Sequence, residues 1–125
     1  MIRLLLDTQI LLWALAGHRR LPREARRLID AHESSVSAAS IWEIAIKVSI
    51  GRLEADPAAV RQALDPSGFE ELAVTGEHAA RVVQLPAHHR DPFDRLLVAQ
   101  SLVEQLVLLT TDSQLAAYGS LVRVV

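Results

Sequence analysis

Two short apolar runs constrain the fold of this chain more than any other feature. The segments from Ile2 to Leu6 and from Val107 to Leu109 are apolar except for Arg3 and are too short for buried helices. Strands of this kind are buried on both faces, as in the centre of a parallel sheet that helices cover. The sequence therefore predicts an α/β fold with a parallel central sheet, right-handed crossovers and helices on both faces.

The rest of the chain alternates helix and strand signals. We expect helices over residues 8–16, 22–31, 40–50, 57–64, 76–84 and 92–105, a short helix after residue 112, and further strands over 35–37, 69–74 and 121–125. Ser40 and Glu43 have the spacing of a capping box, and Asp91 before Pro92 has the form of an N-cap. Because 50% of the 125 residues are hydrophobic, one compact domain over residues 1–125 is expected.

Charge and cysteine content restrict the partners of the chain. A formal net charge of -2 excludes a broad basic surface that would hold nucleic acid by charge alone, so any such binding must be local or assisted by a metal ion. The absence of cysteine excludes disulfides and thiolate metal sites and fits a reducing cytoplasm, which is the expected location. No apolar run is long enough to span a membrane, so no membrane partner is expected.

Acidic residues recur where a strand ends or a helix begins, namely at Asp7, Glu43, Asp94 and Asp112. In an open α/β sheet these positions converge on the edge where ligands bind. Helix capping explains each residue taken alone, and Glu43 also has the i,i+4 spacing for an ion pair with Lys47. Carboxylates that lie close together share a proton or hold a cation, and hard oxygen ligands favour Mg²⁺ or Mn²⁺. We therefore expect a metal site.

A metal held by carboxylates predicts phosphodiester hydrolysis, because it lowers the pKa of bound water and neutralises charge on a phosphoryl oxygen. Whether one or two ions bind is left open. One alternative is another metal-dependent phosphoryl hydrolase, although the chain lacks a Gly-rich phosphate loop and a second Asp two residues after Asp7. Another alternative is a catalytically inactive RNA-binding or protein-binding module whose acidic residues only cap helices.

The sequence resembles the PIN-domain ribonucleases, and most closely the VapC-type toxins of bacterial toxin–antitoxin pairs. The resemblance rests on residues 4–8 with 11–13, 37–47, 89–100 and 108–112. It implies a Rossmann-like domain, dependence on Mg²⁺ or Mn²⁺, endonucleolytic cleavage of RNA and inhibition by a cognate antitoxin protein. A homodimer is also expected, whereas the RNA target is not indicated.

Carried over by position, the resemblance implies a catalytic metal site formed by Asp7, Glu43, Asp94 and Asp112, with Thr8, Asp91 and Thr110 in support. Arg95, Arg90 and Lys47 are candidates for contact with RNA phosphates. Trp13 and Trp42 lie on apolar helix faces, which predicts packing in the core and not stacking on bases.

Overall fold

The central feature of the computed structural model, which describes residues 2–125, is a five-stranded parallel sheet in the order β3-β2-β1-β4-β5. The strands are β1 (Arg3–Leu6), β2 (Glu33–Ser37), β3 (Phe69–Leu72), β4 (Val107–Thr110) and β5 (Val122–Val124). The two apolar runs form β1 and β4, which pair directly near the middle of the sheet. The predicted α/β fold with a parallel sheet is confirmed.

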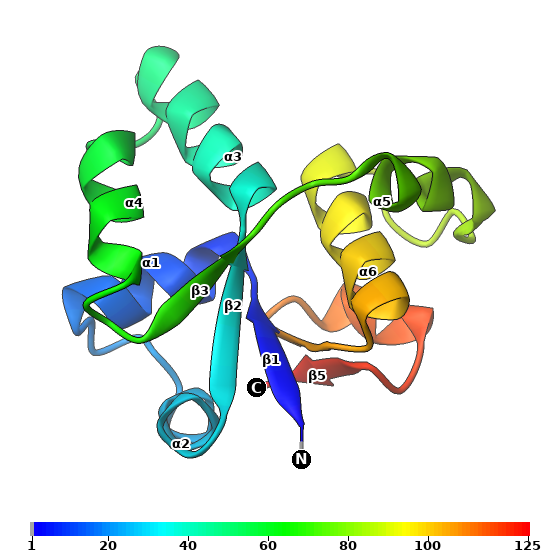
Figure 1. The fold of residues 1–125 in the computed structure, drawn as a ribbon, viewed down its shortest axis with the longest axis horizontal. Coiled ribbons are helices and arrows are strands. Elements are labelled where there is room, and N and C mark those ends of the chain that lie inside the picture. The colour runs from blue at the N-terminus through cyan, green and yellow to red at the C-terminus, as the bar shows by residue number, and fades with distance from the viewer. Residues whose placement is uncertain (1) are drawn as a thin grey trace.

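Helices cover both faces of this sheet (Figure 1). They are α1 (Thr8–Ala16), α2 (Arg23–Ala31), α3 (Ala38–Ser49), α4 (Pro57–Leu64), α5 (Gly76–Arg81) and α6 (Pro92–Glu104), with 3-10 turns η1 (Val82–Gln84) and η2 (Ser113–Tyr118). Because strand side chains alternate between faces, Leu4 and Leu6 join the core beneath α1 to α4, whereas Leu5 joins the core beneath α6. The element ends lie within two residues of those predicted, and the expected helix over 76–84 is divided between α5 and η1.

The start of α3 differs from the sequence prediction. The helix begins at Ala38, where the Ser37 hydroxyl accepts a hydrogen bond of 3.0 Å from the Ala39 N–H. Ser40 therefore lies inside the first turn, and its buried hydroxyl has no hydrogen-bond partner among the described residues. The expected capping box of Ser40 and Glu43 is wrong, because β2 leads directly into α3 and its last residue already serves as the cap. Glu43 consequently lies in the second turn.

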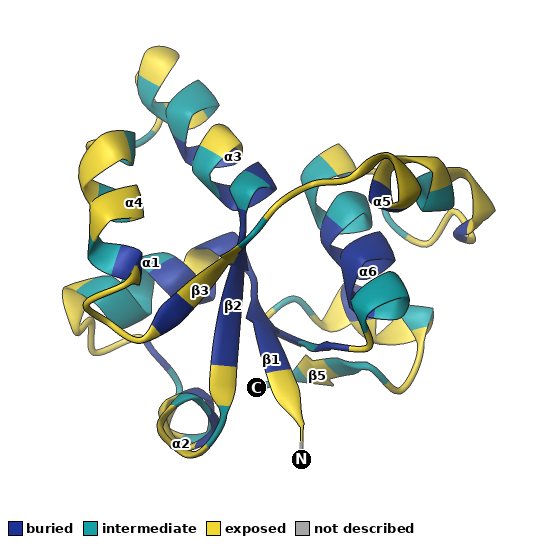
Figure 2. Ribbon diagram, in the orientation of Figure 1, coloured by how far each residue is buried: buried dark blue, intermediate teal, exposed yellow. Residues whose placement is uncertain are grey.

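The carboxyl ends of the parallel strands lie beside the N-termini of several helices. Figure 2 shows β1 and β2 buried over most of their length, while α4 and the far end of α3 are largely exposed. Asp7 follows β1 and caps α1, whereas Asp112 follows β4 and caps η2. No helix within residues 2–125 has the length and apolar character needed to cross a membrane.

Candidate active site

A cavity of about 330 Å³ lies at the carboxyl edge of the sheet. It is lined by Asp7, Thr8, Gln9, Leu12, Glu43, Lys47, Arg52, Leu53, Asp91, Asp94, Thr111 and Asp112. All four acidic residues expected to form a metal site are in this wall, although they come from four separate segments of the chain. The structure thus brings together the residues that the strand ends and helix starts indicated.

Asp7 is held in place through both of its carboxylate oxygens. Oδ1 accepts a hydrogen bond of 2.8 Å from the Ile10 N–H, and Oδ2 accepts one of 2.5 Å from the Thr110 hydroxyl. Burial raises the pKa of Asp7, the two hydrogen bonds oppose that rise, and the charges of Glu43 and Asp112 add to it. Thr110 thereby links the ends of the two central strands and supports Asp7 directly.

Glu43 is fixed by the residue that follows Asp7. The Thr8 hydroxyl donates a hydrogen bond of 2.7 Å to Oε1, and the Lys47 ammonium lies 2.8 Å from Oε2. This confirms the i,i+4 ion pair, and the hydrogen bond that Lys47 donates to Glu43 raises the pKa of Lys47. Thr8 therefore supports Glu43, and Lys47 brings a positive charge into the acidic cavity.

Asp94 is the carboxylate whose ionisation is most perturbed. It stands in the first turn of α6, which Asp91 caps by accepting hydrogen bonds from the N–H groups of Phe93 at 2.8 Å and Asp94 at 3.1 Å. Burial, followed by the negative charges of Asp91, Glu43 and Asp7, raises the pKa of Asp94 to about 7, and His89 opposes that rise. A cation in the cavity would favour the ionised form of this carboxyl.

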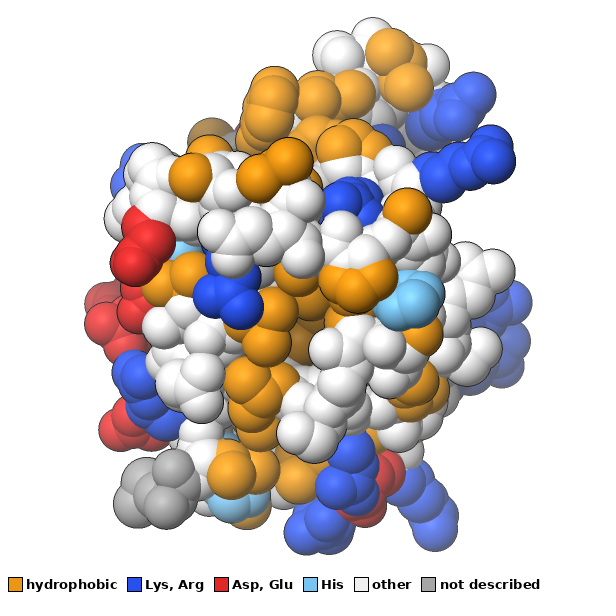
Figure 3. All heavy atoms as spheres, turned by 90° about the vertical axis from the view of Figure 1, so that its right-hand side faces the viewer, with side chains coloured by type: hydrophobic (Ala, Val, Ile, Leu, Met, Phe, Trp, Pro, Cys, Tyr) orange, Lys and Arg blue, Asp and Glu red, His pale blue; other side chains and the backbone are white. Residues whose placement is uncertain are grey.

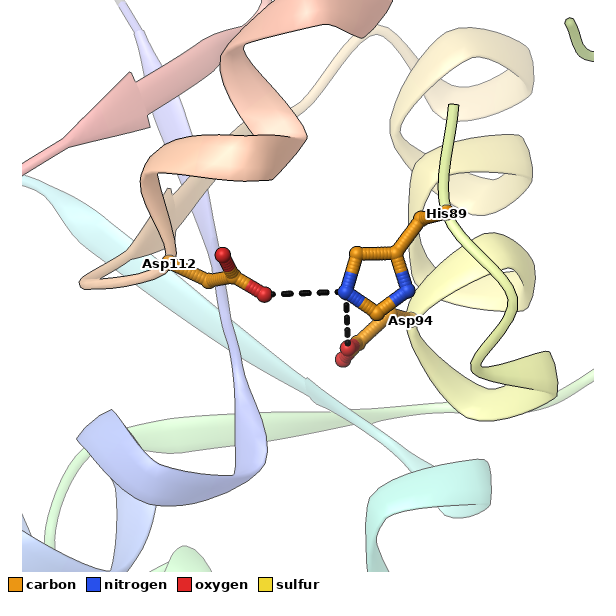
Figure 4. A group of neighbouring side chains, drawn as sticks. All are labelled: His89, Asp94 and Asp112. Atoms are coloured by element: carbon orange, nitrogen blue, oxygen red, sulfur yellow. Dashed lines mark hydrogen bonds and ion pairs between the residues drawn. The ribbon is translucent and has the colours of Figure 1, made fainter. Parts of the chain in front are cut away.

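His89 belongs to the site although the sequence did not identify it as a candidate. Its Nε2 lies 3.0 Å from Asp112 Oδ2 and 3.6 Å from Asp94 Oδ2, between the two carboxylates (Figure 4). The ligand atoms of these three residues all lie within 4.8 Å of one another. In the sequence, His89 begins one of the segments that carry the family resemblance and lies two residues before the helix cap Asp91.

The hydrogen bonds of His89 assign it a positioning role. Its Nδ1 accepts a hydrogen bond of 3.0 Å from the Asp91 N–H, so in the neutral ring the proton is on Nε2. A histidine that binds a metal presents a bare nitrogen and donates its other N–H. His89 has the opposite arrangement, and its Nε2–H donates to Asp112. In this geometry His89 therefore orients the Asp112 carboxylate.

Comparison with known proteins identifies the family. A model of the PIN domain matches residues 4–121. The chain belongs to the PIN domain family. This confirms the resemblance seen in the sequence. No curated protein sequence matches the chain significantly.

Solved structures share the fold of this PIN domain at low sequence identity. A toxin–antitoxin complex from Klebsiella pneumoniae has 22% identity and a TM-score of 0.67, with 96% of this chain and 95% of that chain covered. VapBC2 from Rickettsia felis, bound to a promoter DNA fragment, has 16% identity and a TM-score of 0.68 over 94% and 93%. DNA-bound VapBC from Salmonella typhimurium has 16% identity and a TM-score of 0.64 over 100% and 98%.

The three basic residues expected to contact RNA have different surroundings in the structure. The Arg95 guanidinium donates to the Pro86 and Val82 carbonyls at 3.0 and 3.1 Å and to the Tyr118 hydroxyl at 3.1 Å. Arg95 thus fastens the segment before α6, which leaves its expected contact with RNA without structural support. Lys47 lines the cavity, and Arg90 is exposed. Arg52, which the sequence did not single out, also lines the cavity.

Proposed function

We propose that this PIN domain is a metal-dependent endoribonuclease that hydrolyses RNA phosphodiester bonds and acts as the toxin of a toxin–antitoxin pair. The observation that supports this most strongly is the convergence of Asp7, Glu43, Asp94 and Asp112 on one cavity. Helix capping alone accounts for Asp7 and Asp112. It does not account for Glu43 and Asp94, whose carboxylates share the cavity without capping a helix.

The donor set suits a hard divalent cation. Carboxylate oxygens are the ligands that Mg²⁺ and Mn²⁺ prefer. Burial and the neighbouring negative charges raise the pKa of Asp94 to about 7, and a bound cation would counteract both effects. We therefore assign Asp7, Glu43, Asp94 and Asp112 as the residues that would hold Mg²⁺ or Mn²⁺. When bound, such an ion supplies a more acidic water and neutralises charge on a phosphoryl oxygen.

The remaining residues of the cavity would prepare the site for a phosphodiester. Thr8 and Thr110 fix Glu43 and Asp7 through short hydrogen bonds, and His89 holds Asp112. These contacts keep the carboxylates in fixed positions before the substrate binds. Electrostatic stabilisation of a transition state requires such preorganised groups. Lys47 and Arg52 provide positive charge in the cavity wall, which favours contact with phosphate oxygens.

The proposed partners are a cognate antitoxin and a second copy of this chain, in the cytoplasm. The solved structures with this fold include toxin–antitoxin complexes. A mainly apolar groove of about 540 Å³ shares Gln9, Leu12 and Leu53 with the acidic cavity, so an apolar antitoxin segment seated there would adjoin the site. Co-purification with the antitoxin and light scattering of the isolated chain test these two assignments.

The deciding experiment is cleavage of total cellular RNA by the antitoxin-free protein in Mg²⁺ or Mn²⁺, with the ends of the products mapped. We expect discrete cuts that EDTA and Asp7→Asn each abolish, because EDTA removes the metal ion and Asp7→Asn removes one of its proposed ligands. Asp65→Asn is the matched control, since Asp65 is exposed and lies outside the cavity wall. Unchanged cleavage in both Asp7→Asn and Asp94→Asn would refute the site, and no cleavage by the folded, metal-loaded protein would favour an inactive binding module.

A further inference from the structure

Two aromatic residues are the chain neighbours of Glu43 and Asp94, which line the acidic cavity. Trp42 precedes Glu43 on α3, and Phe93 precedes Asp94 on α6. Their ring centroids are 5.3 Å apart, and the ring planes meet at 75°, so the pair is edge to face. The side chains that follow them both line the cavity. The pair therefore bridges the two helices next to half of the proposed metal ligands.

Trp42 does not pack in the core, contrary to the expectation from the sequence. It is 62% exposed, whereas Trp13 is half-buried against the core beneath α1. Successive side chains of a helix point in directions that differ by about 100°, so Trp42 and Glu43 cannot point the same way. Glu43 turns into the cavity and is buried, which leaves Trp42 directed toward α6 and solvent. A large apolar ring is thus exposed at the edge of a polar site.

The geometry of the pair leaves aromatic surface free for stacking. In an edge-to-face pair one ring meets its neighbour only through its edge, so the neighbour covers neither of its faces. In the other ring the neighbour covers one face only. With Trp42 largely exposed, this surface is accessible to a planar ligand.

We propose that Trp42 and Phe93 form a nucleobase subsite, which takes an unpaired base of the RNA next to the phosphate that is cut. This inference rests on the proposed ribonuclease function and adds the substrate class, because paired bases present no free face. Single-stranded nucleic acids are commonly held by bases stacked on aromatic side chains.

The charge of the chain favours a contribution to affinity that does not depend on phosphate attraction. The chain has a formal net charge of -2, and the cavity holds more carboxylates than cations, so phosphate attraction is weak. Lys47 and Arg52 would contact the phosphates beside the cut, while stacking would supply binding that depends little on salt. The basic side chains would bind the phosphate of a nucleotide, and the aromatic pair would bind its base.

The competing occupant of this surface is a second copy of the chain. Hydrophobic side chains form an irregular band over the side of the molecule that α5 and α6 present, with Lys and Arg at its margins (Figure 3). A dimer contact that covers Trp42, which is 62% exposed, would bury this ring without any base. The position of the pair next to Glu43 and Asp94 favours the nucleotide, because a dimer contact would not need to adjoin the carboxylates.

The fluorescence of Trp42 tests the proposal directly. The chain has two tryptophans, so Trp13→Phe leaves Trp42 as the single reporter. Combined with Asp7→Asn to prevent cleavage, this variant is titrated in Mg²⁺ with an unstructured oligouridine and with a duplex RNA of equal length. We expect saturable quenching by the single strand and little by the duplex. Trp42→Leu should weaken single-strand binding by roughly 10-fold, and Trp42→Phe should retain most of it.

Controls separate this inference from the proposed function. Ile50→Ala alters another exposed apolar residue at the end of α3 and should leave RNA binding unchanged. In the active protein, Trp42→Leu should raise the KM for single-stranded RNA more than it lowers kcat. If the wild type cuts RNA but Trp42 is not quenched, the subsite is wrong and the function stands. If Trp42 emission instead follows protein concentration and Trp42→Leu abolishes a dimer, the surface belongs to a second copy.

Discussion

Replacing Asp94 with Asn should stabilise the metal-free protein at alkaline pH. The pKa of Asp94 is raised from 3.8 to about 7, so the folded state holds the proton more tightly than the unfolded chain does. The stability that this tighter binding contributes is fully present below pH 3.8 and is lost as the pH rises through about 7. At 1.36 kcal/mol for each tenfold change in proton affinity, the charge at pH 8 costs at most roughly 4 kcal/mol.

The cost is an upper value because the Asp94 side chain is 24% exposed and water screens part of the repulsion. Asn keeps the shape of the side chain and removes the charge. We therefore expect Asp94→Asn to raise the free energy of unfolding by roughly 1–4 kcal/mol at pH 8 and by much less at pH 4.5.

Urea denaturation in EDTA at pH 4.5 and pH 8 measures this difference for the wild type, Asp94→Asn and the exposed control Asp65→Asn. Groups that titrate alike in all three proteins cancel in the comparison. A gain that is equal at the two pH values would refute the reasoning, since the repulsion would then not arise from the ionised carboxylate. Adding Mn²⁺ at pH 8 should stabilise the wild type by mass action and Asp94→Asn much less.

Two further predictions concern other positions around the site. Ser37→Ala should lower the free energy of unfolding by roughly 0.5–2 kcal/mol, measured by denaturation, because it removes the N-cap of α3. Ser40→Ala should change it little. A larger loss for Ser40→Ala than for Ser37→Ala would mean that Ser40 is the cap. His89→Leu should weaken Mn²⁺ binding, measured by calorimetry, by roughly 10–100-fold, because Asp112 loses its donor. His89→Gln, which retains an N–H donor, should lose much less, and equal losses in both variants would contradict the positioning role.

The sequence predicted the sheet and the acidic cavity because both depend on local patterns. The runs that form β1 and β4 can only be buried strands, and their neighbourhood in the sheet places Asp7 near Asp112. The place of Asp94 in the cavity could be predicted because Asp91 and Pro92 mark the start of its helix. These signals need no knowledge of how the helices pack.

Other features depend on packing, and the sequence alone could not predict them. Ser37 and Ser40 both have the chemistry of a cap, and the choice between them depends on where β2 ends. Trp42 is exposed because of the way α3 meets α6, which no periodicity encodes. Arg95 is a surface residue by composition, yet its guanidinium is occupied by carbonyl groups that precede it in the chain.

The hydrogen bond between Thr110 and Asp7 spans a sequence separation of 103 residues. The sheet order β3-β2-β1-β4-β5 means that synthesis completes one half of the sheet before β4 is made, so until then β1 remains an edge strand. A nascent chain that stops short of β4 therefore lacks Asp112 and the hydrogen bond from Thr110 to Asp7, and it leaves the backbone N–H and C=O groups along one edge of β1 unpaired. Under the proposed function, the site that cuts RNA therefore closes only after β4 and Asp112 have left the ribosome.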